Sequence, residues 1–566
     1  MRKNFHVCNL LIFIIFAFGM MPCEAAKAEV VNEDVIEINE ENFPDPEFRS
    51  YLSKKYDVDG DSYIDPIEVT ELRPGNVNSL EGIEYFSNLK ILEITSGNLV
   101  ELDVSQNTKL EELKCFNNQL TELDINSNTE LKILVCSHNS ISELDVNNNT
   151  KLERLYCDQN NLTELDISAL TNLEKLACGS NNLTELDVSS NINLIELACD
   201  ENDLSELDIS NNAKLKLLYC DENNLTELDI SNNKKLIEIM CHYNNLTELN
   251  VHNNIDLEGL YCYQNNLIEL DVSRNEKLMS LLCDDNNLVK LNVNNNSKLD
   301  YLSCSNNRLS ELDVSVCVNL MTLRCNNNDL KCLILGNDTK LEELYCYSNR
   351  LTELDVSRNE NLVNLNCANN ELEKLNISNT PNLNHLQCQY NNLTEIDVSN
   401  NINLKTLKCY CNDLRSLDVS SNINLNLVEF DFEKIEEMDL SKNMELKDVD
   451  LHFMELPRRG TVDVSKIVFP DTMSGKTIDY ILNDLGIYVD DTPGIAIHAE
   501  QISVDKQSEP VIVETKEDTF AESMIENAEE QKSNFDFRIL YYSIDFITCF
   551  VIVLICGFKL RKKRTD

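Results

Sequence analysis

The feature that most constrains this chain is a repeat of 21 residues with one cysteine in each period. Its first full copy is L-x-x-L-x-C-x-x-N over residues 110–118, and an asparagine follows each repeated cysteine by three residues, from Asn118 to Asn412. A fixed period of this length indicates a solenoid, in which each repeat forms one coil and packs against its neighbours. The repeated cysteines keep their register without a slip, at Cys115, Cys136, Cys157, Cys178, Cys199, Cys220, Cys241, Cys262, Cys283, Cys304, Cys325, Cys346, Cys367, Cys388 and Cys409.

We interpret this cysteine column as a core position. Unpaired cysteine behaves as a small buried hydrophobe. Strands of neighbouring coils would lie about 4.8 Å apart with parallel side chains, whereas a disulfide needs Cβ atoms about 3.8 Å apart. We therefore expect reduced core thiols rather than disulfides, zinc ligands or redox cysteines. Cys317 and Cys332 fall outside the repeated column, and we expect both to lie outside the core.

Each coil has two halves with different patterns. The x-L-x-C-x half alternates with period two, as a strand buried on one face does, and successive strands would stack into one parallel sheet. The asparagine after it would bond backbone groups of its own and the next coil, forming a ladder. The returning half, L-T-E-L-D-V-S-x-N, carries an outer column of aspartates from Asp103 to Asp439. Because Asp and Ser favour local turns, we expect extended segments and tight turns there.

The repeat L-x-x-L-x-[L/C]-x-x-N-x-L over residues 78–456, about eighteen coils, resembles the leucine-rich repeats. Its cysteine and its L-D-V-S-x-N return resemble the cysteine-ladder internalins of Gram-positive bacteria. The resemblance implies an α/β-class horseshoe of mostly parallel β structure with an extended, turn-rich convex side. It also implies a non-catalytic protein of the bacterial cell surface that binds other molecules.

The composition narrows the possible partners. The formal net charge of the 566 residues is −50, which repels nucleic acids and favours divalent cations and basic partners. The sequence has no H-E-x-x-H, G-x-S-x-G or phosphate-binding glycine loop, so we expect no enzymatic activity.

The N-terminal region predicts a signal peptide followed by a small cap. Residues 1–28 have a basic start, an apolar run and a small-x-small site at residues 26–28; cleavage after Ala25 is the alternative, and Cys23 follows a sequence that fits a lipoprotein signal poorly. Residues 36–77 are expected to form a helical cap, in which Asp45 precedes Pro46 as a helix N-cap.

Within this cap, residues 57–68 resemble an EF-hand calcium loop. The resemblance implies one calcium ion held by oxygen atoms of alternate residues, with the last ligand on an exiting helix. Ser62 departs from the family, which has glycine at the sixth position. The alternative is an acidic turn that caps the segment after Pro66. The expected ligands are Asp57, Asp59, Asp61, the Tyr63 carbonyl, Asp65 and Glu68.

The C-terminal region loses the repeat. Residues 457–502 are expected to form a small module, and residues 503–538 an acidic disordered stalk. Residues 539–558 are apolar over a length that crosses a bilayer, and the basic residues 559–566 follow directly. We therefore expect a single-pass membrane protein with its N-terminal region outside and its tail in the cytoplasm.

The concave sheet is the predicted recognition surface, because residues beside each buried Leu and Cys point outward there. Exposed aromatic residues rimmed by acids on a rigid face are typical of a binding patch. We expect adhesion to an extracellular protein or glycan; the alternative is an envelope spacer that binds nothing tightly. The candidate binding residues form two groups, which are a middle cluster of Tyr219, Met240, His242, Tyr243, Tyr261 and Tyr263 and a second aromatic group that includes Tyr345 and Tyr347.

Overall fold

The computed structural model describes residues 35–452, apart from 96, 338, 339, 432, 433 and 436, and also residues 461–462, 467–468, 470, 487–489 and 497–499. The chain divides into Met1–Ala499 and Glu500–Asp566, and only the first unit contains described residues. The predicted signal peptide, stalk, membrane helix and basic tail all lie outside them. Within the described ranges, no helix combines the length and apolar character that crossing a membrane requires.

The described unit begins with a cap made of β1 (Ile36–Glu37), α1 (Pro46–Tyr56) and β2 (Tyr63–Ile64). As predicted, Asp45 caps α1: its Oδ1 accepts hydrogen bonds from the backbone N–H groups of Glu47 and Phe48. Its Oδ2 accepts from the N–H groups of Asn78 and Ser79, which belong to the first coil. One carboxylate therefore both starts the helix and ties the cap to the solenoid.

Aromatic packing closes the N-terminal end of the core. The Phe43 ring stacks on Phe86 of the first coil at 5.9 Å between centroids and meets Phe48 of α1 edge-on at 5.7 Å. Gly82 allows this approach, because it has a φ of 99° and a Cβ there would lie 2.3 Å from the Asn42 carbonyl oxygen. The short 3₁₀ helix η1 (Ile83–Tyr85) follows it.

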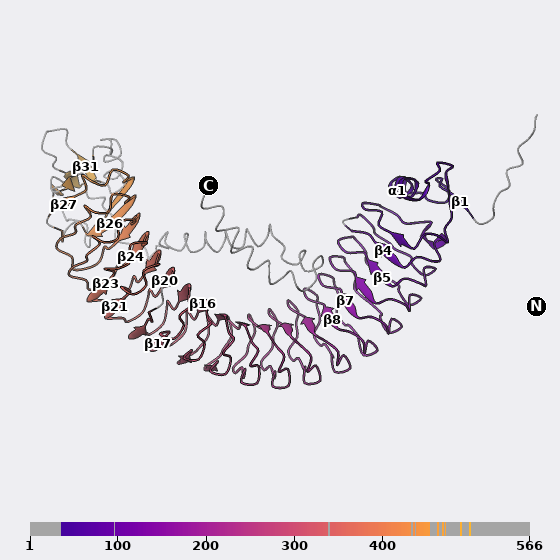
Figure 1. The fold of residues 1–566 in the computed structure, drawn as a ribbon, viewed down its shortest axis with the longest axis horizontal. Helices are drawn as coiled ribbons and strands as arrows, with labels where there is room; N and C mark the ends of the chain where they lie inside the picture. The colour runs from indigo at the N-terminus through magenta and orange to yellow at the C-terminus, as the bar shows by residue number, and fades with distance from the viewer. Residues whose placement is uncertain are drawn as a thin grey trace, which may run out of the picture. The chain divides into compact units, whose positions relative to one another are not determined.

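One long parallel sheet runs through the coils, on the inner side of the arc that they follow (Figure 1). Neighbouring strands pair with a 21-residue offset, as in Leu197↔Leu218↔Ile239. No pairing joins its first and last described strands, so the sheet is open. Its strands are β3 (Glu71–Leu72), β4 (Ile91–Glu93), β5 (Glu112–Lys114), β6 (Ile133–Val135), β7 (Arg154–Tyr156), β8 (Lys175–Ala177), β9 (Glu196–Ala198), β10 (Leu217–Tyr219), β11 (Glu238–Met240), β12 (Gly259–Tyr261), β14 (Ser280–Leu282), β16 (Tyr301–Ser303), β18 (Thr322–Arg324), β20 (Glu343–Tyr345), β22 (Asn364–Asn366), β24 (His385–Gln387), β25 (Thr406–Lys408), β26 (Leu427–Asp431) and β28 (Asp448–His452).

The sheet starts earlier than the sequence predicted. Strand β3 lies in the segment 36–77, which was expected to be only a cap, and it pairs with β4. Short parallel strands also form on the outer side, in the C-terminal half: β13 (Leu270–Asp271) with β15 (Leu291–Asn292), β17 (Glu311–Asp313) with β19 (Cys332–Ile334), β21 (Glu353–Asp355) with β23 (Lys374–Asn376), and β27 (Met438–Asp439) with β30 (Ile467–Val468). In the segment 457–502, β29 (Thr461–Val462), β32 (Ile497–Ala499) and β31 (Ile487–Val489) form an antiparallel sheet.

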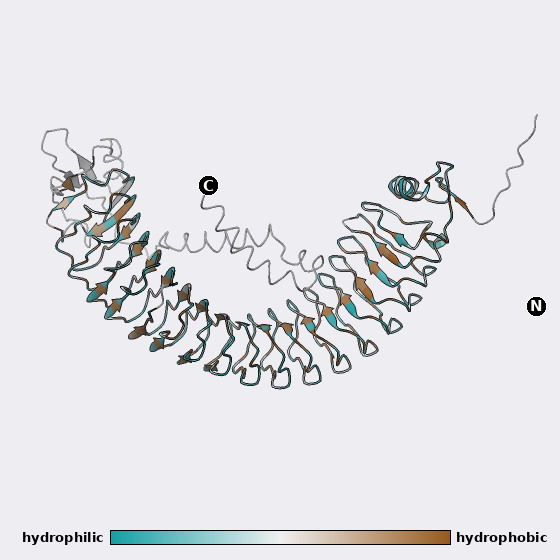
Figure 2. Cartoon of the chain, viewed as in Figure 1, coloured by the Kyte–Doolittle hydropathy of each residue, from teal (hydrophilic) through white to brown (hydrophobic). Residues whose placement is uncertain are grey.

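The core is a stack of similar apolar layers, and apolar residues recur in the strands (Figure 2). The fifteen repeated cysteines are all unpaired and buried, as predicted. Burial raises the pKa of the Cys115 thiol to about 12, so the thiol stays protonated at neutral pH. Larger residues take the cysteine column at both ends, with Ile94 before Cys115 and Phe430 after Cys409, and both are buried. The cysteine column is therefore a packing column.

An asparagine ladder lines the turn after each inner strand, as predicted. The Asn244 side chain shows the pattern: its Nδ2 donates to the carbonyls of Cys241 and His242 in its own coil and of Cys220 in the preceding coil. Its Oδ1 accepts from the Leu225 N–H, also in the preceding coil. The ladder thus joins each coil to the preceding one, whereas the sequence analysis expected the next one.

A second asparagine ladder, which the sequence analysis missed, lies at the end of the outer half. Asn254 is fully buried, and its Nδ2 donates to the carbonyls of Ile230 and Asn233 in the preceding coil. Leu170, Cys317 and Thr380 replace the asparagine at buried positions of this column. The prediction for Cys317 was therefore wrong: it is 1 % exposed, because it fills a ladder position. Cys332 is exposed on β19, as expected.

Candidate functional site

The inner face presents a fixed backbone with variable side chains. The residues directly before and after each ladder cysteine face away from the core, because side chains alternate along a strand. The second residue after each cysteine has a φ between 48° and 57° in every coil from Asn117 to Cys411. This left-handed conformation is rare for residues other than Gly, Asn and Asp, and it turns the chain out of the sheet. No glycine occupies this position in any of these coils, so the sequence analysis did not predict the left-handed conformation.

Three rings meet near the middle of this face. His242 stacks on Tyr263 with 4.2 Å between ring centroids and 20° between planes. Tyr243 meets both rings edge-on, at 5.6 Å from His242 and 5.5 Å from Tyr263. These three predicted residues therefore form one cluster, in which Tyr243 is 50 % exposed.

Three further predicted residues lie on adjacent strands. Tyr219, Met240 and Tyr261 occupy the same position of β10, β11 and β12 and are paired in register. They are half-buried rather than exposed, which corrects the expectation, because close neighbours on a sheet cover each other's sides. Burial also raises the pKa of Tyr261. Glu238 is the missed residue here: burial raises the pKa of its carboxyl, against a hydrogen bond with Tyr219 that lowers it.

Tyr345 and Tyr347 form a separate group. They lie four coils beyond Tyr261 and Tyr263, since 345 − 261 = 84 residues, or about 19 Å at ~4.8 Å per strand. The Arg324 guanidinium, which the sequence analysis did not single out, lies 5.3 Å from the centre of the Tyr345 ring. Burial raises the pKa of both tyrosines, although the charge of Arg324 acts against it. The eight predicted residues are therefore two groups on one face.

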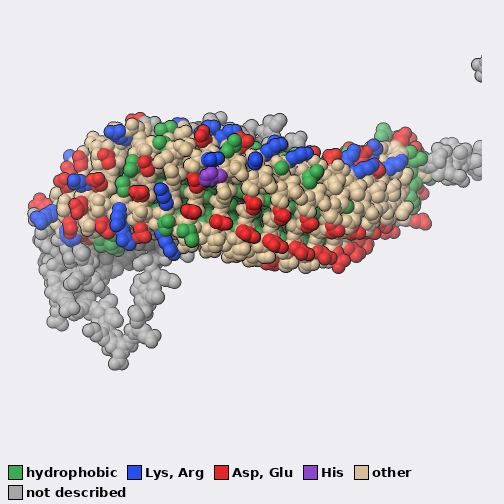
Figure 3. All heavy atoms as spheres, turned by 90° about the horizontal axis from the view of Figure 1, so that it is seen from below, with side chains coloured by type: hydrophobic (Ala, Val, Ile, Leu, Met, Phe, Trp, Pro, Cys, Tyr) green, Lys and Arg blue, Asp and Glu red, His purple; other side chains and the backbone are tan. Residues whose placement is uncertain are grey.

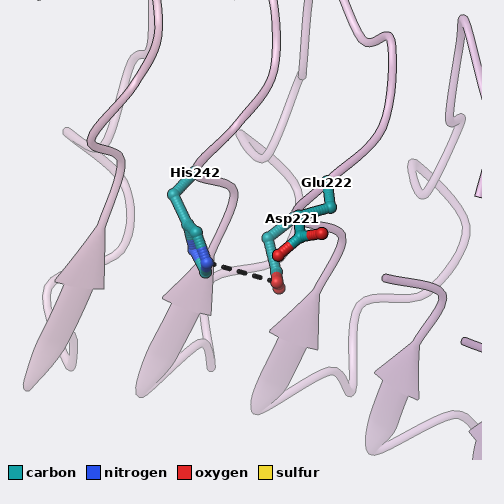
Figure 4. Close-up of side chains that lie close together, drawn as sticks. All are labelled: Asp221, Glu222 and His242. Carbon is teal, nitrogen blue, oxygen red and sulfur yellow. Dashed lines mark ion pairs between the residues drawn. The ribbon is translucent and has the colours of Figure 1, made fainter. Parts of the chain in front are cut away.

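Acidic residues adjoin the first group. Asp221 comes directly after Cys220 in the column that holds His242 one coil later, and Glu222 follows Asp221. Figure 4 shows the three side chains converging beyond the ends of their strands, with 3.3 Å between His242 Nε2 and Asp221 Oδ2. Burial, with the charges of Asp221 and Glu222 among the nearby groups, raises the pKa of Tyr263. The sequence analysis placed acids at the rim of the patch, and the stacking of the coils brings Asp221 to His242.

The predicted calcium loop brings three of its six ligands together. Carboxylate oxygens of Asp57, Asp59 and Asp61 all lie within 4.8 Å of one another. Asp57 Oδ1 is buried without a hydrogen-bond partner, which is the environment of a metal ligand. Ser62 has a φ of 67°, so it takes the left-handed conformation for which the family uses glycine. These observations fit an oxygen-coordinated cation.

The second half of the loop differs from the EF-hand expectation. Tyr63 lies on β2, which pairs with β1. The exiting helix is absent: residues 66–68 form a turn, because the chain must enter β3 soon after them. Asp65 Oδ1 accepts a hydrogen bond from the Ile67 N–H, as in the acidic-turn alternative, and Glu68 is exposed.

The outer face carries a long acidic groove that the sequence analysis did not anticipate. Its floor is a row of nearly buried leucines from Leu144 to Leu270, and its volume is about 1950 Å³. Glu and Asp columns line it, such as Glu206 and Asp208 in one coil. Figure 3 looks at this face and shows the acidic side chains in a row over the N-terminal coils, on the right. The Asp column forms the predicted turns; for example, Asp208 Oδ1 accepts from the Ser210 N–H at 2.9 Å.

The thiol of Cys411 is partly exposed, which raises the question of whether it could act as a nucleophile. Cys411 follows ladder residue Cys409 by two and has a φ of 53°. Burial, assisted by the charge of Asp431, raises its pKa, whereas a nucleophilic cysteine needs a lowered pKa. Cys411 is therefore poorly suited to nucleophilic catalysis.

No protein-family model matches the chain, and no curated protein matches it. Among solved structures, the functional domain of InlJ from Listeria monocytogenes, which includes a cysteine ladder, is 28% identical, with a TM-score of 0.53 over 83% of this chain and 94% of that one. A leucine-rich repeat protein of Leptospira interrogans is 24% identical, with a TM-score of 0.50 over 62% and 92% of the two chains. The plant peptide hormone receptor RGFR1, in complex with RGF2, is 20% identical, with a TM-score of 0.51 over 68% of each chain. The chain therefore has the leucine-rich repeat fold, and in its cysteine ladder it is similar to the internalin InlJ.

Proposed function

We propose that this protein is a non-catalytic binding protein that holds an extracellular protein or glycan on the inner face of its sheet. The observation that carries the proposal is the cluster of His242, Tyr243 and Tyr263 on a rigid surface. Exposed aromatic rings supply a large contact area and lose little conformational entropy on binding.

The backbone at Tyr243 supports a role beyond folding. A bulky residue held at a φ of 48° costs about 1–3 kcal/mol. Most other coils place Asn, Ser, Gln, Asp or Glu at this position. The fold therefore does not require an aromatic ring there, and a half-exposed ring adds little to the core. Tyr390 shares this backbone position, so what distinguishes Tyr243 as the candidate anchor is its contact with His242 and Tyr263.

The likeness to known proteins supports the same class of function. RGFR1 is a leucine-rich repeat receptor seen in complex with RGF2, so the fold can present a binding face. A sheet already ordered by two hydrogen-bond ladders avoids part of the entropy cost of association.

The test compares two tyrosines in the same backbone position. Tyr243→Ser should abolish binding of the purified protein to a responsive target, found by screening a glycan array and a panel of cell types. Tyr390→Ser is the matched control, because Tyr390 has a φ of 55°, is 49 % exposed and lies seven coils away. Equal binding by both variants and the parent would remove the patch from the proposal.

The spacer alternative predicts a different response. Removing one whole coil far from the patch, such as residues 116–136, shortens the protein without changing the three rings. A spacer should lose function in proportion to the length removed, whereas a binding protein should keep its target.

We also propose that the loop 57–68 binds one calcium ion. The buried, unpartnered Asp57 Oδ1 within the three-carboxylate cluster favours it. Glu68 would complete the coordination from the exposed side. Glu68→Gln should weaken calcium binding at least tenfold in a calcium titration, whereas the exposed control Glu81→Gln should not. Unchanged calcium affinity in Glu68→Gln would exclude this ligand set.

We further propose that residues 539–558 anchor the protein in the cell membrane with the solenoid outside. The support is the apolar length and the basic residues after it. Protease added to intact cells should remove the solenoid and leave an epitope fused to the C-terminus intact. Protection of the solenoid would contradict this orientation.

A further inference from the structure

We propose that Asp221, Glu222 and His242 bind a divalent transition-metal ion of the zinc type on the inner face. One ligating atom from each side chain lies within 4.8 Å of the others. Zinc bonds of about 2.1 Å in a tetrahedral site place ligand atoms roughly 3.4 Å apart. The 3.3 Å between His242 Nε2 and Asp221 Oδ2 already has this spacing. The exposed Glu222 side chain supplies the third ligand, since a carboxylate oxygen of Glu222 lies within the same 4.8 Å.

The ligand types select the class of ion. Imidazole nitrogen together with carboxylate oxygens suits zinc and its neighbours in the first transition row, whereas calcium and magnesium prefer oxygen alone. Two carboxylates and a neutral imidazole would balance the charge of a divalent ion. The net charge of −50 further concentrates cations near the surface.

The surroundings hold the histidine in a suitable orientation. The His242 side chain is only 12 % exposed, and its ring is stacked on Tyr263 and bordered by Tyr243. This packing fixes the ring plane, so Nε2 is aimed at Asp221 without a ligand (Figure 4). Ring orientation of this kind increases metal affinity, because less freedom is lost on binding.

A second pair in the protein provides a natural comparison. His252 Nε2 lies 3.4 Å from Asp271 Oδ2 on the outer face, with nearly the same spacing. Its side chains are more exposed, at 39 % and 56 %, and no third ligating residue joins them among the described residues. The proposal therefore predicts metal binding at His242 and not at His252.

The proposed metal site requires only the ion, and it does not depend on the proposed recognition function. Three protein ligands leave a coordination position for water or for a donor atom of another molecule. Binding of zinc without any partner tests the site, and binding of a partner by metal-free protein tests the aromatic patch. The two proposals can therefore fail separately.

The experiment is a calorimetric titration of the full-length protein, in detergent and with a non-chelating reductant, with Zn²⁺ in the presence of 1 mM Ca²⁺. We expect one zinc ion with a micromolar or lower Kd, weakened at least tenfold in His242→Gln and in Asp221→Asn. The control His252→Gln should bind as the parent does. Glu222→Gln is the variant least able to disturb folding, because Glu222 is exposed, and it should also weaken binding. Parent-like affinity in His242→Gln, or no zinc uptake by the parent, would overturn the proposal.

A cobalt spectrum separates this site from the many thiols. Co²⁺ bound by nitrogen and oxygen should show weak visible bands without thiolate-to-cobalt charge transfer. Those bands should disappear in His242→Gln and persist in His252→Gln. A strong charge-transfer band that survives His242→Gln would place the metal on cysteine and contradict the assignment.

Discussion

The inner and outer halves of each coil keep different residues constant. On the inner half, Leu, Cys and Asn recur while their outward neighbours change, from Lys114 to Tyr219 to Arg324 in one column. On the outer half, the outward residues themselves recur, as Glu and Asp on either side of a buried Leu. The difference indicates that turn formation constrains the outer surface, whereas the residues of the inner surface are free to vary from coil to coil.

The two halves also differ in the direction in which the pKa of a carboxyl group is shifted. On the inner face, burial raises the pKa of Glu238 and of Asp284. On the outer face, the backbone N–H and the hydroxyl of Ser231 lower the pKa of Asp229. The charged forms of Glu238 and Asp284 therefore carry a desolvation cost, whereas Asp229 is stabilised as an anion.

The largest expected effect is on the shared core. Leu260→Ala should lower the free energy of unfolding by about 2–5 kcal/mol, because it opens a cavity beside the inner sheet. Val289→Ala is the control, since Val289 is 54 % exposed, and it should stay within about 0.5 kcal/mol. Urea denaturation of both variants measures this. Equal loss in the two would mean that the buried column is not what stabilises the coil.

A smaller effect should separate the two asparagine ladders. Asn244→Ala leaves buried carbonyls and the Leu225 N–H without their partner, at a cost of about 1–3 kcal/mol. Asn254→Leu should cost less, because Leu170 already fills that column in another coil. Hydrogen exchange should show faster opening of the adjacent coils in Asn244→Ala. A greater loss in Asn254→Leu would reverse the ranking of the ladders.

The smallest effects should have opposite signs on the two faces. The raised pKa of Glu238 means that its charge destabilises the fold at neutral pH and stops doing so below the unfolded-state value of about 4.3. Glu238→Gln should therefore be more stable than the parent at pH 7, and this advantage should disappear by pH 3.

The lowered pKa of Asp229 acts the other way. Its contribution is present above the unfolded-state value of about 3.9 and is lost as the pH falls through the folded-state value. Asp229→Asn should be slightly less stable than the parent at pH 7 and should approach it in acid. Urea midpoints at both pH values measure the two variants, and equal signs on the two faces would refute the contrast.

Much of the fold was predictable because it is periodic. The position of Cys115 in a repeated x-L-x-C-x strand was enough to predict a parallel sheet, a buried thiol and an inner asparagine ladder. Asp45 before Pro46 was enough to predict the start of α1. Such features depend on contacts between residues at a fixed separation in the sequence, so the repeat is enough to predict them.

The candidate site was predictable only in part. The repeat predicts that Tyr243 and Tyr263 point outward but not that they contact His242, because that contact depends on side-chain rotation. The sequence did place Tyr345 and Tyr347 in a second aromatic group, and the strand spacing separates them from the first group in the same way. The loop sequence alone could not predict that no helix follows Glu68. The chain there leads into β3, and β3 forms because it pairs with β4.

The sequence by itself determined the coil, its core columns and its outer turns, because each is repeated with one register and each repeat reinforces the same contacts. Only the tertiary structure decided which variable residues meet. Asp221 and His242 are a full period apart, and they become neighbours because coils stack in parallel with no offset.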